Sequence, residues 1–228
     1  MKKRLAGSPN CQPTVTDRRE VIINYQLSIA MKLILSSNSP RRRELLAGLD
    51  IPFEVRVVSG IDESFPDDLP TDEIAEFVAR KKAAAYAVAE DEIVITADTI
   101  VVLDGEVLGK PRDLADAAAM LRRLSGRTHR VITGVTLKNY VKQTSFSVVS
   151  EVTFKSLSEA EISYYLRYYK PLDKAGAYGI QEWIGYIGVT SLSGSYFNVM
   201  GFPVQRIHEV LCKEFGLNFQ DFDKTLKL

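Results

Sequence analysis

The segment that indicates the fold reads Lys32-Leu-Ile-Leu-Ser-Ser-Asn-Ser-Pro-Arg-Arg-Arg-Glu-Leu-Leu46. Its apolar beginning is typical of a short buried strand. Ser39 and Pro40 then fit the N-cap and the first position of a helix, and the leucines that follow continue the helical period. The sequence therefore predicts a strand followed directly by a helix.

Arg41, Arg42 and Arg43 lie in the first turn predicted for this helix. A helix N-terminus already carries partial positive charge and unpaired N–H groups, so cations are unfavourable there unless an anion binds. Phosphate is the obvious anion, because its oxygens match both free amides and guanidinium groups. The alternative is that the arginines are solvated and partly neutralised by Glu44 and neighbouring acids.

Composition limits the class of protein. A chain of 228 residues with 46% hydrophobic content can bury a substantial core. The 29 Lys and Arg residues balance 29 Asp and Glu residues, so no overall basic field favours stable binding to nucleic acid. Cys11 and Cys212 are the only cysteines, which argues against a disulfide scaffold and favours a reducing cytoplasm. No apolar run approaches the length of a membrane span.

Residues 1–30 differ from the rest, because they are polar and show no clear period. We interpret them as a flexible N-terminal extension that precedes a single α/β domain at residues 31–228. Within that domain strands and helices alternate, which favours a mixed central sheet with flanking helices. We expect strands at 53–58, 93–103, 107–108, 128–138 and 144–156, and helices at 72–90, 113–124, 158–169 and 203–215.

Asp98 interrupts a stretch, Ile93–Leu103, that otherwise suits the interior of a sheet. An unpaired carboxylate would cost several kcal/mol there or become protonated. It is tolerated at a strand end that faces a cleft, or beside a cation. Asp98 is therefore a candidate metal ligand or general base, and the alternative is a turn aspartate bonded to backbone amides.

Other charged residues offer candidate roles beside this aspartate. Asp62 and Glu63, in an acidic loop, could supply a second carboxylate for a divalent ion, although a solvated loop is the simpler reading. Lys110 lies in a constrained Gly-Lys-Pro loop and could contact phosphate, and Lys82 lies on a predicted helix. Both lysines could equally be solvated.

Three further residues with reactive side chains show no catalytic pattern. His129 and His208 lack the partner spacing of a zinc site or a nucleophile triad, so we interpret both as structural. Cys212, on the terminal helix, is interpreted as a core residue.

Several motifs, in order along the chain, closely resemble the Maf family of nucleotide pyrophosphatases. They are Ser37–Leu46, Ala97–Thr99, Gly109–Pro111, Asp116–Gly126, Asp173–Gln181 and Gly194–Gly201. The resemblance implies an elongated α/β fold with two lobes around a cleft, like that of the inosine triphosphate pyrophosphatases. It also implies a cytoplasmic, dimeric enzyme that hydrolyses nucleoside triphosphates to monophosphate and pyrophosphate with Mg²⁺ or Mn²⁺.

The resemblance also implies how the charged groups contact the substrate. By position in the motifs, Ser37, Arg41 and Arg42 would hold the phosphates. Lys82 and Lys110 would neutralise the charge that develops on the leaving pyrophosphate.

The same resemblance implies the groups for chemistry and selectivity. Asp98 would accept the proton of the attacking water, and Glu63 with Asp98 would hold the metal. The pattern is similar to the branch that acts on dTTP and UTP, with Arg41, Thr99 and Gln181 at the specificity positions.

One departure from the family pattern lies beside these positions. Glu182 stands where the family commonly has glycine, so the base pocket would have a different edge. A competing interpretation of the whole chain is a non-catalytic nucleotide or nucleic-acid binder that regulates septum formation. A third is phosphoryl transfer to an acceptor.

Overall fold

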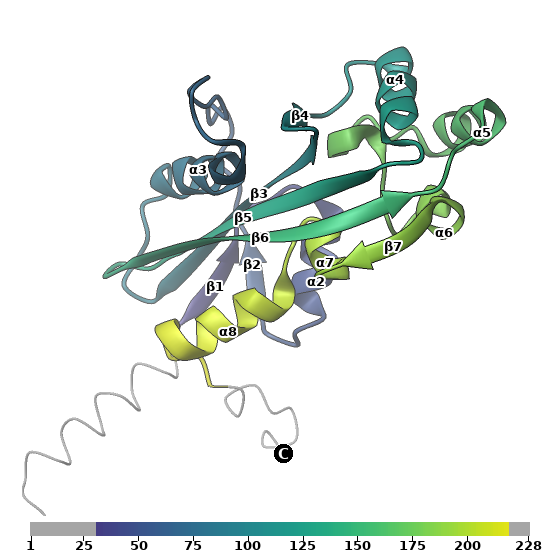
Figure 1. Cartoon of the computed structure of the whole chain (residues 1–228). Coiled ribbons are helices and arrows are strands. Elements are labelled where there is room, and N and C mark those ends of the chain that lie inside the picture. The colour runs from purple at the N-terminus through teal and green to yellow at the C-terminus, as the bar shows by residue number, and fades with distance from the viewer. Residues whose placement is uncertain (1–30, 219–228) are drawn as a thin grey trace, which may run out of the picture.

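A mixed sheet of seven strands forms the centre of the computed structural model, which describes residues 31–218 (Figure 1). The interpretation of residues 1–30 as an extension lies outside the described residues. The strands are β1 (Lys32–Leu35), β2 (Phe53–Val55), β3 (Glu92–Leu103), β4 (Glu106–Leu108), β5 (Thr128–Lys138), β6 (Gln143–Phe154) and β7 (Val189–Ser193). The strand order is β2-β1-β3-β5-β6-β7, with β4 also paired to β3. Strand β1 is parallel to β2 and β3, and the other pairs are antiparallel, which confirms the predicted mixed sheet.

Helices cover both faces of this sheet (Figure 1). They are α2 (Pro40–Ala47), α3 (Thr71–Ala84), α4 (Leu114–Leu124), α5 (Glu159–Tyr169), the 3₁₀ turn η1 (Ala175–Ala177), α6 (Trp183–Gly188), α7 (Tyr196–Val199) and α8 (Val204–Phe215). Between residues 31 and 218, no helix has both the length and the apolar character needed to cross a membrane.

Two predicted boundaries are wrong. The strand expected at 53–58 ends at Val55, because its only neighbour, β1, ends at Leu35 and leaves no strand for later residues to pair with. The helix expected at 72–90 ends at Ala84. The chain then turns to bury Tyr86, whose hydroxyl bonds to Ser36 and to the amide of Val58.

Strand β3 is paired differently along its two edges. On one edge β5 pairs with it continuously from Val94 to Val102. On the other edge β3 pairs with β1 only as far as Ile95, and its pairing with β4 starts only at Val101. No strand among residues 31–218 covers the backbone of residues 96–100 on this edge, so the sheet opens there.

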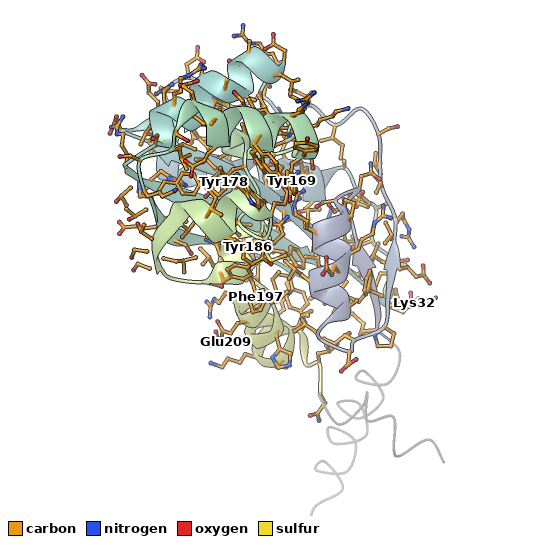
Figure 2. All side chains as sticks on the ribbon, turned by 90° about the vertical axis from the view of Figure 1, so that its right-hand side faces the viewer. Lys32, Tyr169, Tyr178, Tyr186, Phe197 and Glu209 are labelled. Carbon is orange, nitrogen blue, oxygen red and sulfur yellow. The ribbon has the colours of Figure 1, made fainter. Side chains whose placement is uncertain are left out.

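Separate apolar clusters flank this opening. One packs α2 and α8 against β1 and the first half of β3, through residues such as Leu46 and Ile207. The other packs α4, α5 and α6 against the second half of β3, through residues such as Leu121 and Tyr165. Figure 2 shows Tyr178 and Tyr169, the last residue of α5, in the upper part of the view and Glu209 of α8 in the lower part. These clusters correspond to the two lobes that the family resemblance implies.

Helix α3 approaches the opposite face of the sheet unusually closely at Gly134. This glycine pairs with Asp98 across the β3–β5 ladder. A Cβ at Gly134 would lie 2.2 Å from both the carbonyl carbon of Ala75 and the amide nitrogen of Glu76, so only glycine lets the helix backbone rest on the strand. The close approach brings the later turns of α3, with Lys82, over Asp98.

We therefore expect Gly134→Ala to destabilise the fold by about 3 kcal/mol, because two backbones must separate to admit the methyl group. Chemical denaturation measures the change. Gly48→Ala is the matched control, since a Cβ at Gly48 meets nothing nearer than 3.4 Å and its φ of −66° is helical. Equal stabilities of the two variants would show that α3 does not rest on Gly134.

A buried histidine lies in the second lobe. His129 is 2% exposed and packs edge-on against Phe154 and Tyr178, with ring centroids 5.4 and 5.3 Å away. Its Nε2 lies 2.7 Å from the Tyr178 hydroxyl, and its Nδ1 has no partner among the described residues. Burial lowers the pKa of His129 from 6.5 to about 4, so the imidazole is neutral in the folded protein. This supports the interpretation of His129 as structural.

This burial makes stability depend on pH. The unfolded chain binds the proton below about pH 6.5, whereas the folded chain resists it until about pH 4, so stability falls as pH decreases through this window. We expect a loss of about 2 kcal/mol between about pH 7 and about pH 5. His129→Gln should flatten the dependence, and His208→Gln, with His129 still present, should retain it. A wild-type stability that is constant over this range would contradict the assignment.

Candidate active site

A cleft with a volume of about 760 Å³ lies at the open edge of β3. Every residue that the family resemblance implies for the site lines it. They are Ser37, Arg41, Arg42, Glu63, Lys82, Asp98, Thr99, Lys110 and Gln181. The structure therefore brings together segments from six separate parts of the chain, and the cleft lies between the two lobes.

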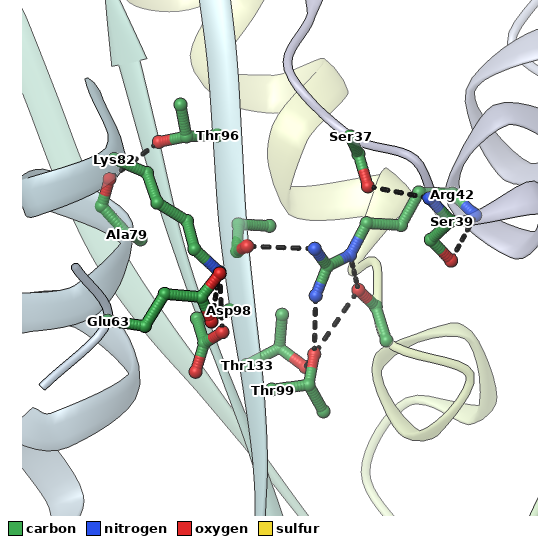
Figure 3. Close-up of polar contacts among 12 residues, drawn as sticks. Ser37, Ser39, Arg42, Glu63, Ala79, Lys82, Thr96, Asp98, Thr99 and Thr133 are labelled. Atoms are coloured by element: carbon green, nitrogen blue, oxygen red, sulfur yellow. Dashed lines mark hydrogen bonds and ion pairs between the residues drawn. The ribbon is translucent and has the colours of Figure 1, made fainter. Parts of the chain in front are cut away.

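Arg42 closes the edge that the strands leave open. Its Nη1 donates to the carbonyl of Ala97 at 2.8 Å, its Nε to the carbonyl of Gly201 at 2.9 Å, and its Nη2 to Thr99 Oγ1 at 3.1 Å (Figure 3). Burial lowers the pKa of Arg42, and the nearby carboxylate of Asp98 opposes that effect, so the guanidinium stays charged. A guanidinium has five N–H groups, so Arg42 keeps two beyond these three bonds.

The helix that carries this arginine begins as predicted. Ser39 is its N-cap and accepts the amide of Arg42, and Pro40 occupies the first turn. No acid lies in that turn. Ser37, which is buried, accepts the amide of Ser39 at 3.1 Å, so its hydroxyl is fixed at the wall of the cleft.

Asp98 and Thr99 project from opposite faces of β3, because successive side chains of a strand alternate. Thr99 faces Arg42, and its Oγ1 lies 3.0 Å from Thr133 Oγ1. Asp98 faces α3, where its Oδ1 accepts from Lys82 Nζ at 2.8 Å (Figure 3). The sequence is compatible with Asp98 either at a strand end that faces a cleft or beside a cation. The structure places it in mid-strand beside a cation.

Lys82 joins two carboxylates. Its Nζ lies 2.8 Å from Asp98 Oδ1 and 3.1 Å from Glu63 Oε2, and its side chain is only 13% exposed. Both acids therefore point toward one position in the cleft. Asp98 lines the cleft, and its Oδ2 has no hydrogen-bond partner within residues 31–218.

Asp62 does not join this group. Its carboxylate is exposed and pairs with Lys81 at 2.7 Å. Hydrogen bonds from Lys81 and Ser64 hold the pKa of Asp62 well below its usual range. Of the two acids in this loop, only Glu63 reaches Lys82.

Arg41 and Lys110 are the more accessible cations of the cleft. Arg41 Nη1 pairs with Asp173 Oδ2 at 2.9 Å. Lys110 is exposed and makes no ion pair with any residue that the structure describes. Gln181 contributes a different feature, since its Oε1 is buried and has no hydrogen-bond partner in the described part of the chain.

Sequence reasoning gave no role to several residues that shape the cleft. Asp173 and Lys174 lie inside the motif Asp173–Gln181, but the sequence gives no sign of the ion pair between Asp173 and Arg41 that the fold brings about. Asn198, in a segment where no chemistry was evident, is fully buried and donates to the carbonyl of Val131 and to Ser150 Oγ. It holds α7 against the sheet next to Gly201.

A second hollow, also of about 760 Å³, lies on the outer surface between the end of α2 and α8. It contains Cys212, which is partly buried rather than a core residue as predicted. Burial raises the pKa of this thiol, which disfavours the thiolate needed for nucleophilic attack.

Comparisons with known proteins show which family this chain resembles. The family model for Maf-like proteins matches residues 32–214. A dTTP/UTP pyrophosphatase of Phocaeicola vulgatus is 60% identical over 184 residues, covering 80% of this chain and 95% of the relative. A protein of the same name from Porphyromonas gingivalis is 50% identical over 189 residues, covering 81% and 94%.

Among solved structures, a HAM1 protein from Coxiella burnetii matches 54% of this chain and 73% of its own at 16% identity. Its TM-score of 0.35 is too low to support an argument. The family model matches most of this chain, and the two relatives are matched over nearly their whole length. These findings show the family directly. The chain belongs to the family of Maf-like proteins.

Proposed function

We propose that this protein hydrolyses dTTP and UTP to the nucleoside monophosphate and pyrophosphate. The observation that carries the proposal is a single cleft lined by Arg41, Lys82, Lys110 and Asp98, in which Lys82 holds Asp98 Oδ1 and Oδ2 has no partner among residues 31–218. The names of the relatives, which are dTTP/UTP pyrophosphatases at up to 60% identity, support the same activity.

In this reaction a water oxygen attacks the α-phosphorus, and the bond from that phosphorus to the oxygen bridging to the β-phosphorus breaks. Pyrophosphate leaves with the electron pair. Asp98 Oδ2 accepts the proton of the water, while Lys82 holds Oδ1 and fixes the orientation of the carboxylate. Cations placed where negative charge develops lower the barrier most, because they stabilise the transition state more than the substrate.

The phosphate contacts follow from accessibility. Lys110 has no ion-pair partner in the described part of the chain, and Arg41 can exchange the exposed carboxylate of Asp173 for a phosphate oxygen. Ser37 lies at the N-terminal turn of α2, whose amides favour an anion. The three protein bonds of Arg42 favour a role in fixing the cleft wall, with its remaining N–H groups available to phosphate.

Gln181 Oε1 supports the choice of base. A buried acceptor without a partner favours a ligand that brings an N–H donor. Thymine and uracil carry an imide N–H at position 3, whereas cytosine has an acceptor there. We therefore assign Gln181 to recognition of the pyrimidine imide, with Thr99 and Arg41 on the neighbouring walls.

The carboxylates of Asp98 and Glu63 fit a divalent metal. Both converge on Lys82 Nζ, which lies 2.8 Å from Asp98 Oδ1 and 3.1 Å from Glu63 Oε2. No cluster of three or more His, Cys, Asp or Glu in the described ranges could hold a metal. Mg²⁺ and Mn²⁺ suit such a site, because Mg²⁺ binds one or two carboxylates and completes its shell with water and substrate phosphates. When bound, the metal would supply further charge neutralisation for the triphosphate.

We also propose three properties of the enzyme that concern its compartment, its binding to nucleic acid and its oligomeric state. The small number of cysteines supports a reducing cytoplasm, and the balanced charge argues against stable binding to nucleic acid. The homodimer implied by the family resemblance is the third.

A panel of nucleoside triphosphates with Mg²⁺ or Mn²⁺, resolved by product, tests the function. We expect pyrophosphate from dTTP and UTP at rates well above those with CTP, ATP and GTP, and loss of turnover with a chelator. Thermal protection by nucleotides without any product would instead support the binder. Nucleoside diphosphate as the product would support phosphoryl transfer.

Asp98→Asn tests the proton acceptor. We expect kcat to fall by about 10²–10⁴-fold, because the amide cannot take the proton of the water, with the melting temperature close to that of wild type. Asp62→Asn is the matched control, since it makes the same change in an acid that does not face Lys82. Near wild-type hydrolysis of dTTP by Asp98→Asn would remove Asp98 from this role.

A further inference from the structure

Glu182 holds an unusual position at the start of α6. It is the N-cap residue, yet its side chain does not bond to the amides of its own helix. Its Oε1 instead pairs with Lys174 Nζ at 3.0 Å, and its Oε2 accepts the hydroxyl of Tyr165. A carboxylate beside a helix N-terminus would ordinarily bond there, so the fold directs it to a different task.

The partners of Glu182 are buried. Tyr165 is fully buried, and the side chain of Lys174 is only 9% exposed. Burial and, after it, the bond to Glu182 raise the pKa of Tyr165. The phenol therefore stays protonated and donates a hydrogen bond to the carboxylate. Lys174 also contacts Asp173 Oδ1 at 2.8 Å. A buried ammonium is stable only with such partners, which makes this arrangement rigid.

The same group of side chains holds the backbone turn that carries Gln181. The Tyr165 hydroxyl accepts the amide of Gly179 at 3.1 Å. A Cβ on Gly179 would lie 2.9 Å from Glu182 Cδ and 3.1 Å from Gln181 Nε2, so both side chains flank this glycine. Tyr165 therefore bonds the turn 179–181 directly and Glu182 holds Tyr165, and neither side chain lines the cleft.

The chain of charges also reaches the other end of the cleft. Lys174 connects Glu182 to Asp173, and Asp173 pairs with Arg41 at 2.9 Å. One end of the series therefore lies at the predicted base-reading residue, and the other at a predicted phosphate-binding arginine.

We propose that Glu182 is a positioning residue for base selection, which bridges Lys174 and Tyr165 and so fixes Gln181 Oε1 toward the imide of the pyrimidine. The inference rests on the proposed function. At this position the family that the chain resembles commonly has glycine. Here Glu182 orients Gln181, which recognises the base, without touching the base itself. Glu182 acts through the turn, and no proton or bond of the substrate passes through it.

Glu182→Gln tests the inference with little change in shape, because the amide keeps the bond from Tyr165 but loses the charge that pairs with Lys174. We expect the ratio of kcat/KM for UTP over CTP to fall by about tenfold, mainly through a higher KM for UTP, because a displaced Gln181 loses its contact. Tyr165→Phe, which removes the bonds to Glu182 and to the Gly179 amide, should shift the ratio in the same direction. Glu159→Gln is the matched control, because Glu159 pairs with Arg122 on the surface and does not line the cleft.

Each outcome decides the inference. A lower melting temperature with an unchanged UTP-to-CTP ratio would give Glu182 a role in stability alone and overturn the proposal, while the proposed hydrolysis would stand. Equal shifts in Glu182→Gln and Glu159→Gln would also overturn it. Wild-type protein that releases no pyrophosphate from any nucleotide would remove the proposed function and this inference together.

Discussion

Along one edge of β3, pairing with β1 stops at Ile95 and pairing with β4 starts at Val101. The backbone between them would face solvent unpaired, and Arg42 instead bonds to the carbonyl of Ala97 and to that of Gly201 on a distant segment. A guanidinium thus replaces a missing strand and ties the α7 region to the sheet. The two apolar clusters lie on either side of this interruption, so the cleft between them lies where the strand pairing stops.

Most of the cations that surround this cleft are already paired with carboxylates. Lys82 contacts Asp98 and Glu63, and Arg41 contacts Asp173. Pairing of this kind limits repulsion between cations in a partly dry site. A polyphosphate that binds therefore exchanges one set of anions for another, and the gain in free energy is the difference between them. This exchange favours ligands with several closely spaced charges over those with one.

Local features of the fold could be predicted because they depend on near neighbours in sequence. The N-cap at Ser39 and the proline in the first turn of its helix both appear as expected. The partner of Asp98 could not be predicted in this way. Lys82 reaches it only because Gly134, on a third segment, admits α3 to the sheet. The contacts of Asp173, Lys174 and Glu182 could not be predicted for the same reason, since their partners lie elsewhere in the sequence.

The alternation of side chains along β3 has a consequence for how such a protein can change. Asp98 and Thr99 are consecutive in the chain, yet one faces the lysine of α3 and the other faces the arginine of α2. The group proposed for hydrolysis and the group proposed for substrate recognition are thus separated by the thickness of a single strand. Substitutions can accumulate on the side of β3 that faces Arg42 while the side that faces Lys82 stays intact. The substrate preference of one fold can therefore change while its hydrolytic chemistry is kept.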